Sequence, residues 1–256
     1  MIKKMHTPNL LGRSVLVSVF SLVAPLVQAA EFTAVVDWSG RVTLTLPVSG
    51  VLDSISAQAG QVVKKGEVLA SLEPTLFKAG VAESRADMDR LGEEHADAKR
   101  DLERVQELYA RTVAATTELD AAKLRFARAS SGLAAAQARV ERARRLLAET
   151  ELRAPFDARI LVRHAEPGLA ISSQCQPAAV VTIARADEFI ARAQVNVAQV
   201  AGIQLGDKAE VSVAGVNLQG KVRAISSSAD HRYTLEVALP QRAGLLAGQQ
   251  ASIRLP

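Results

Sequence analysis

The side chains that most often carry chemistry are sparse in this chain. Its four histidines, His6, His95, His164 and His231, stand far apart and share no spacing typical of metal ligands. Its only cysteine is Cys175. The sequence therefore favours neither an internal disulfide nor a cysteine-based zinc site.

Asp157 and His164 are the nearest approach to an acid–base pair. Catalysis needs a nucleophile, a base and a stabilising donor in mutual geometry, and no serine or cysteine stands with these two residues in a supporting context. The chain also lacks a phosphate-binding glycine loop. We therefore expect no catalytic residue, no metal and no cofactor, and we predict that the protein is not an enzyme.

The net charge of +4 has a local origin. Of the 256 residues 48% are apolar and 23% charged, which is typical of a globular protein. Lys3, Lys4 and Arg13 are basic and no acidic residue lies within residues 1–29, so the rest of the chain is almost neutral. Nucleic acid is therefore not an expected partner.

Residues 1–29 have the pattern of a secretory signal peptide. A basic start precedes an apolar run from Val15 to Val27, interrupted by Pro25, and small residues follow at Ala29 and Ala30. No cysteine lies near this cleavage region, so a lipoprotein is not expected. The sequence predicts a periplasmic protein, with an uncleaved membrane anchor as the alternative.

Residues 74–150 are predicted to form an antiparallel helical hairpin. Apolar or small residues recur in steps of three and four from Phe77 to Tyr109 and again from Leu119 to Leu147, which is the period of a coiled-coil seam. The interval between Thr112 and Thr116 is long enough only for a reversal, and Thr117 followed by an acidic residue three positions later suggests a helix cap.

The segments flanking this hairpin resemble each other. Gly50 and Ala158 are 108 residues apart, as are Gly60 and Gly168, within short β-rich stretches. Gly66 marks a further turn, and Pro155 opens the second stretch. We expect residues 30–73 and 151–184 to be two halves of one lipoyl-like domain, and residues 185–256 to form a small β-barrel from alternating strands and one short helix capped by Asn196. The fold class is thus mixed α and β.

The stretches from Pro47 to Leu52, from Gly60 to Leu69 and from Leu152 to Ala158 resemble periplasmic adaptor (membrane-fusion) proteins of the HlyD family, although that family usually has glycine at the position of Ala158. The resemblance implies an adaptor of a tripartite efflux system, without a membrane-proximal domain. It also implies a homo-oligomeric ring, commonly a hexamer, that connects an inner-membrane transporter, expected to be of the RND type, to a TolC-like outer-membrane channel.

The same resemblance places channel docking at the hairpin tip. Adaptors of TolC-like channels carry arginine, leucine and serine at fixed spacing there; Arg104 and Leu108 match, whereas Ala115 occupies the serine position. Thr116 and Thr117 follow and could supply the hydroxyl. The alternative is that Arg104 is an ordinary solvated charge and Leu108 packs within the hairpin.

Two other functions remain open from the sequence, and a third is disfavoured by the position of its residues. An adaptor of an ABC-type exporter or type I secretion system would share every feature above. A stand-alone periplasmic coiled-coil binding protein would need clustered Met, His or Cys, and the chain has three Met. A lipoyl-type carrier would need its lysine at the hairpin tip that the helices occupy, whereas Lys64 and Lys65 lie in an earlier turn.

Overall fold

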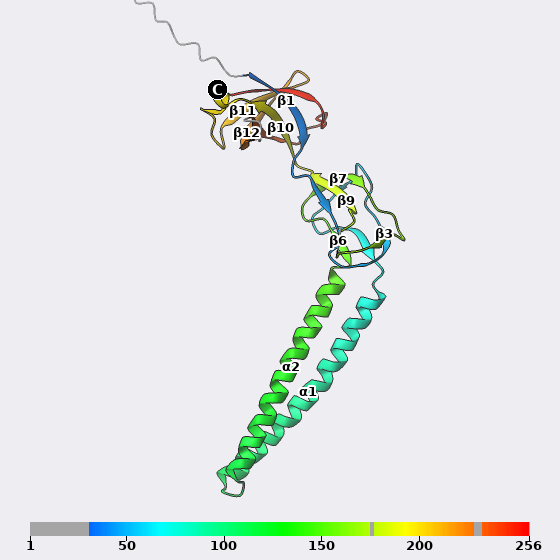
Figure 1. The fold of residues 1–256 in the computed structure, drawn as a ribbon, viewed down its shortest axis with the longest axis vertical. Helices are drawn as coiled ribbons and strands as arrows, with labels where there is room; N and C mark the ends of the chain where they lie inside the picture. Colours follow the sequence, from blue (N-terminus) through cyan, green and yellow to red (C-terminus); the bar gives the residue numbers. More distant parts are fainter. Residues whose placement is uncertain (1–30, 175–176, 228–231, 256) are drawn as a thin grey trace, which may run out of the picture.

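A computed structural model describes residues 31–174, 177–227 and 232–255. Its three parts follow one another along the long axis of the molecule: a β-barrel, a second β domain and a helical hairpin (Figure 1). Both ends of the described chain lie in the barrel, and the hairpin projects from the far side of the middle domain. The predicted signal peptide lies outside the described residues. Among the helices that are described, none is both long and apolar enough to cross a bilayer.

The middle domain, called the sandwich below, contains two four-stranded antiparallel sheets. One has the order β2-β9-β7-β4 and the other β6-β5-β3-β8. The strands are β2 (Val42–Leu44), β3 (Gly50–Ile55), β4 (Val62–Val63), β5 (Val68–Leu72), β6 (Glu151–Arg153), β7 (Ala158–Arg163), β8 (Ala170–Ile171) and β9 (Val181–Arg185). Each sheet takes two strands from before the hairpin and two from after it. The prediction that both flanks close one β unit is therefore confirmed.

The 108-residue offset appears in the structure as a repeated pair of hydrogen bonds. The amide of Gly60 donates to the carbonyl of Ile160 at 2.8 Å, and the amide of Gly168 donates to the carbonyl of Leu52 at 2.7 Å. The two glycines have φ angles of +88° and +90°, a region that glycine reaches without the steric cost of a Cβ. Each half thus contributes the same turn and binds a strand of the other half.

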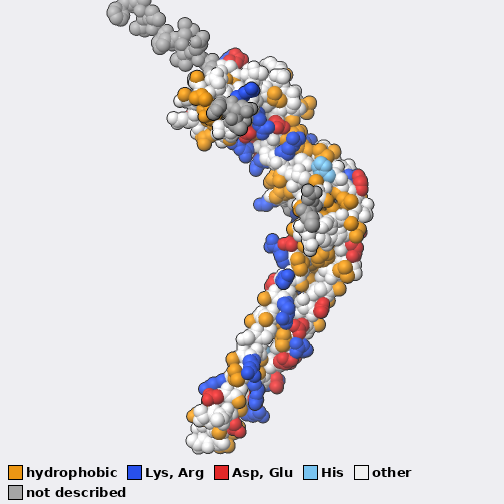
Figure 2. Space-filling view, viewed as in Figure 1, with side chains coloured by type: hydrophobic (Ala, Val, Ile, Leu, Met, Phe, Trp, Pro, Cys, Tyr) orange, Lys and Arg blue, Asp and Glu red, His pale blue; other side chains and the backbone are white. Residues whose placement is uncertain are grey.

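The hairpin consists of α1 (Thr75–Ala110) and α2 (Thr116–Ala148), of 36 and 33 residues. The predicted seam faces the partner helix, with its most buried positions at Val81, Leu119, Ala122, Ala136 and Val140. Two of these five are alanines, whose small side chains let the helices approach closely. Basic and acidic side chains are spread along the outer surface of the hairpin (Figure 2), and the two helices run together away from the sandwich (Figure 1).

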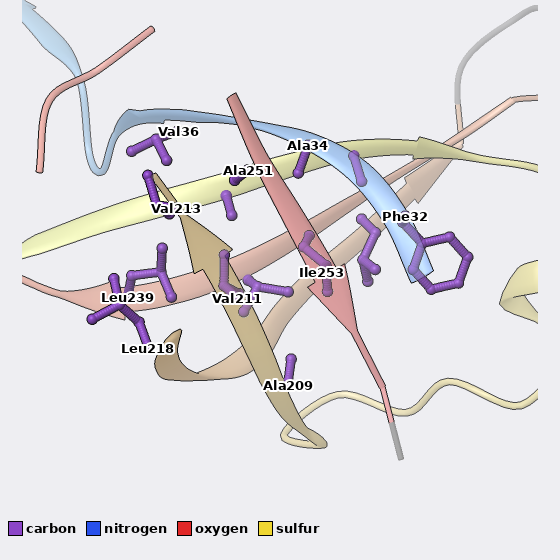
Figure 3. Packing of buried hydrophobic residues seen from close by; sticks show 14 of the residues in the cluster. Phe32, Ala34, Val36, Ala209, Val211, Val213, Leu218, Leu239, Ala251 and Ile253 are labelled. Carbon is purple, nitrogen blue, oxygen red and sulfur yellow. The ribbon is translucent and has the colours of Figure 1, made fainter. Parts of the chain in front are cut away.

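The barrel is closed by six strands in the order β1-β10-β13-β12-β11-β14. These are β1 (Glu31–Trp38), β10 (Glu188–Val195), β11 (Lys208–Val213), β12 (Val216–Ser227), β13 (Tyr233–Pro240) and β14 (Gln250–Arg254). The short helix α3 (Val197–Val200) follows β10, and the side chain of Asn196 caps it as predicted. Alternate residues of each strand point inward, and Figure 3 shows Val211, Leu239 and Ile253 converging in the core.

One boundary of the sequence prediction was wrong. Residues 31–38 were assigned to the first lipoyl-like half, residues 30–73, but β1 pairs with β10 and β14 and belongs to the barrel. Its inward residues Phe32, Ala34 and Val36 are buried in the barrel core (Figure 3). A barrel has no free edge, so the strands after the sandwich need this N-terminal strand to complete the closure.

Candidate functional site: the tip of the helical hairpin

The reversal between the helices is a Schellman motif. The amide of Val113 donates to the carbonyl of Leu108 at 2.9 Å, and the amide of Thr112 donates to the carbonyl of Tyr109 at 2.9 Å. This geometry places Thr112 at φ +58°, a left-handed conformation that glycine usually provides. A β-branched residue there carries backbone strain at the tip.

The second helix begins two residues earlier than the sequence predicts. Thr117 was the expected cap, but α2 starts at Thr116 and its N-cap is Ala115. The side chain of Glu118 accepts a hydrogen bond from the amide of Ala115 at 3.4 Å. Because a methyl group accepts no hydrogen bond, no cap side chain binds the first amides of α2.

The structure places all the predicted docking residues at this end of the hairpin. Arg104 and Leu108 are four residues apart and lie on the same face of α1. The side chain of Arg104 is 72% exposed and pairs with Asp101, and Leu108 is 37% exposed. The other three, Ala115, Thr116 and Thr117, are exposed at the start of α2.

Two apolar residues at the tip, Val113 and Tyr109, are exposed although the sequence pattern does not predict it. Val113 is 71% exposed and Tyr109 is 42% exposed, although Tyr109 was expected to end the buried seam. Tyr109 is the last residue but one of α1, and the opposite helix begins only at Thr116. At the tip α2 therefore no longer covers these two side chains. The sequence does carry a signal for Val113, because an apolar residue inside so short a reversal has little to pack against.

Two matching ion-pair clusters brace the hairpin. In one, Asp87 pairs with Arg90 at 2.7 Å and with Arg139 of the opposite helix at 2.5 Å. In the other, Asp101 pairs with Arg104 and, at 2.7 Å, with Arg125 of the opposite helix. The equivalent residues differ by 14 positions on each helix, which is two heptads.

The arginines of these ion pairs are exposed to solvent, so the pairs stabilise the fold only slightly. Hydrogen bonds from Arg90, which has the larger effect, and from Arg139 lower the pKa of Asp87. This carboxylate is therefore charged at neutral pH. Both clusters join α1 to α2, and the second one holds the Arg104 side chain beside Asp101.

The predicted motif residues of the sandwich lie where the two halves meet. Gly66 has φ +85°, and its amide donates to the carbonyl of Ala154, next to Pro155. A Cβ on Gly50 would lie 3.2 Å from the Leu72 Cδ1 atom, so a larger residue there would displace the buried Leu72 side chain. These positions are structural and lie away from the hairpin tip.

Lys64 and Lys65 contact the second half rather than standing free. The Lys64 Nζ atom lies 2.9 Å from the Asp157 Oδ2 atom, and the Lys65 amide donates to the Asp157 Oδ1 atom at 2.9 Å. Both hydrogen bonds lower the pKa of Asp157, and the one from the Lys65 amide has the larger effect. Asp157 thus joins the start of the second half to a turn of the first.

The structure does not bring Asp157 and His164 into contact. His164 shares a 2.8 Å hydrogen bond with the Thr182 hydroxyl, and the ring of His95 packs 5.1 Å from that of Phe126. Within the described residues no group of three or more His, Cys, Asp or Glu side chains could hold a metal ion. Cys175 lies outside those residues.

Comparisons with known proteins agree with this geometry. The family model described as "CzcB-like, barrel-sandwich hybrid domain" matches residues 41–185, more than half of the chain. A search of curated proteins finds no match. Among solved structures, a MacA-MexA chimeric protein containing the Pseudomonas aeruginosa MexA α-hairpin domain has 17% identity and a TM-score of 0.68, covering 89% of this chain and 80% of that one.

Two further structures share the fold. The membrane fusion protein Spr0693 from Streptococcus pneumoniae R6 has 15% identity and a TM-score of 0.63, covering 89% of this chain and 98% of that one. MacA from Actinobacillus actinomycetemcomitans has 15% identity and a TM-score of 0.55, with 89% and 78% covered.

Barrel, sandwich and hairpin in this order define the class: the chain has the fold of membrane fusion proteins. The chain belongs to the CzcB-like barrel-sandwich hybrid family. The resemblance to HlyD-type adaptors that the sequence predicted is thus confirmed for fold and family.

Proposed function

We propose that the protein is a periplasmic adaptor of a tripartite efflux system, joining an inner-membrane transporter of the RND type to a TolC-like outer-membrane channel. The observation that carries the proposal is the rod. A helix of 36 residues rises by about 54 Å at 1.5 Å per residue. Its exposed tip therefore lies far from both β domains (Figure 1).

The tip has the chemistry of a docking surface rather than of a reaction site. Val113, Tyr109 and Leu108 offer exposed apolar area, and Arg104 offers a charged donor beside them. Thr116 and Thr117 add hydroxyl groups. A channel that presents carboxylates or backbone carbonyls next to apolar side chains would complement this surface.

Several copies would stand side by side in a ring, commonly of six, so that the rods enclose a conduit. Substrate would pass through the conduit without being chemically changed. The arginine and leucine at the tip and the predicted signal peptide favour an RND transporter as the inner-membrane partner. Recovery of an ATP-driven exporter with the protein would instead support the ABC-type alternative.

The matched pair Arg104→Asp and Arg90→Asp tests the docking. Both arginines are exposed and paired with an aspartate three residues earlier, but Arg90 lies about 21 Å nearer the sandwich. The Arg104→Asp variant should lose co-purification with the outer-membrane channel and the drug resistance that depends on it. The Arg90→Asp variant should retain both, at equal helicity by circular dichroism. Equal behaviour of the two variants would contradict the proposal.

A further inference from the structure

A cleft of about 510 Å³ lies at the joint between the barrel and the sandwich. The chain crosses this joint between β1 and β2 and again between β9 and β10. The barrel lines the cleft with Trp38, Phe189 and the loop of residues 241–246, and the sandwich lines it with Gly60 and residues 159–162 of β7. Its two walls therefore belong to different domains.

One wall of the cleft is aromatic. Trp38 is half-buried and provides this wall; Phe189, which is fully buried in the barrel core, stacks on it with ring centroids 4.7 Å apart, and the Arg159 guanidinium carbon lies 5.8 Å from the centre of the Trp38 ring. Leu246 is 62% exposed and Val162 is 43% exposed on the lining. The cleft thus offers apolar area to the body of a ligand.

Arg159 is incompletely paired. Its Nη1 atom donates to the carbonyl of Gly60 at 2.9 Å, whereas its Nε atom is buried without a hydrogen-bond partner among the described residues. No described carboxylate forms an ion pair with it. Only the Nε atom is desolvated; the rest of the side chain is partly exposed, so its other N–H groups can donate charge-assisted hydrogen bonds to an anion in the cleft.

The charge on the lining is uniformly positive. Arg41, Arg159 and Arg242 line the cleft, and none of its described lining residues is acidic. Elsewhere in the described β domains most arginines have an ion-pair partner, namely Arg153, Arg163, Arg185, Arg192, Arg223 and Arg254. Figure 2 shows Lys and Arg side chains gathered around this neck, with a few acidic ones among them.

We propose that the cleft binds a small organic anion with an aromatic or apolar body. The anionic group lies among Arg159, Arg242 and Arg41, and the body packs on Trp38 and Leu246. The volume suits a ligand of drug size. Because the bound anion would contact both domains, it would hold the joint in one orientation. This inference stands apart from the proposed function, since it does not involve the hairpin tip.

Trp38 is the only tryptophan of the chain, so its fluorescence reports on the cleft alone. The probe is 1-anilinonaphthalene-8-sulfonate, an aromatic anion that accepts energy from tryptophan. Saturable energy transfer from Trp38 is expected in the full-length protein. The uncharged N-phenyl-1-naphthylamine, which has the same rings without the sulfonate, should bind at least about tenfold more weakly.

Arg159→Gln and Arg242→Gln should each weaken binding of the sulfonate by about tenfold or more. Arg242 lies in an exposed loop, so its variant separates lost binding from lost folding. The control is Arg163→Gln, on the same strand as Arg159 but paired with Glu166 and outside the cleft; it should bind like the wild type. Absent energy transfer, equal binding of the uncharged probe, or equal binding by all variants would overturn the proposal.

Discussion

Replacing Ile160 by alanine probes how the two halves of the sandwich depend on each other. Ile160 is 0% exposed in β7, and its amide donates to the carbonyl of Gln61 in the first half at 2.9 Å. The change removes three buried carbon atoms, worth about 2.4 kcal/mol of transfer free energy. The cavity left behind adds to this, so we expect the sandwich to lose about 2–5 kcal/mol of unfolding free energy.

Native-state hydrogen exchange measures this loss strand by strand. A loss of 2 kcal/mol accelerates exchange through opening of the sandwich roughly 30-fold. The acceleration should be shared by β3 and β5 before the hairpin and by β7 and β9 after it, because these strands lie in common sheets. Leu52→Ala, at the equivalent position of the first half and 1% exposed, should accelerate the same strands.

Val162→Ala is the control, since Val162 lies on the same strand but is 43% exposed. It should cost less than about 1 kcal/mol. If Ile160→Ala accelerates exchange only in residues after the hairpin, the two halves unfold separately and the interlocked sandwich is wrong.

Three further changes have defined outcomes. Thr112→Gly should raise the unfolding free energy of the hairpin by about 0.5–1 kcal/mol, because the left-handed conformation costs threonine about 1–2 kcal/mol and costs glycine little. Denaturant titrations followed by circular dichroism measure this gain. No gain would show that the turn is unstrained. Asp157→Asn should lower stability at pH 7, since Lys65 and Lys64 lower the pKa of the native carboxyl below its ordinary value of 3.8. That deficit should shrink as the pH falls through the lowered pKa, where the wild type also loses the charge; a deficit independent of pH from 7 down to 2 would refute the linkage. Gly220→Ala should destabilise the barrel by about 1–3 kcal/mol in thermal unfolding, because the added Cβ would lie 2.6 Å from the Val237 Cγ1 atom. An unchanged melting temperature would show that the strands move apart without loss of stability.

The parts of the fold that the sequence predicted are those with a repeated signal. The steps of three and four residues indicated the hairpin because a seam must recur over many turns. The shared offset of Gly50 and Gly60 to Ala158 and Gly168 indicated the two halves because each half makes the same turn. In both cases several residues constrained one structure.

The missed features depend on contacts between distant segments. The alternation of Phe32, Ala34 and Val36 fits a strand of either β domain, and only pairing with β10 and β14 assigns it to the barrel. Arg159 carries no motif, and its cleft exists only because a barrel loop and β7 meet. At the tip, spacing located Arg104 and Leu108, whereas the exposure of Tyr109 depends on where the opposite helix begins.

The most direct test of the adaptor function is site-specific photocrosslinking in intact cells. A photoreactive residue at Val113, which is 71% exposed at the tip, is compared with one at Leu76, which is 80% exposed at the base of α1. A docked rod predicts a crosslink from position 113 to an outer-membrane channel protein and none from position 76. A channel crosslink from position 76 alone, or none from position 113 at equal expression, would contradict it.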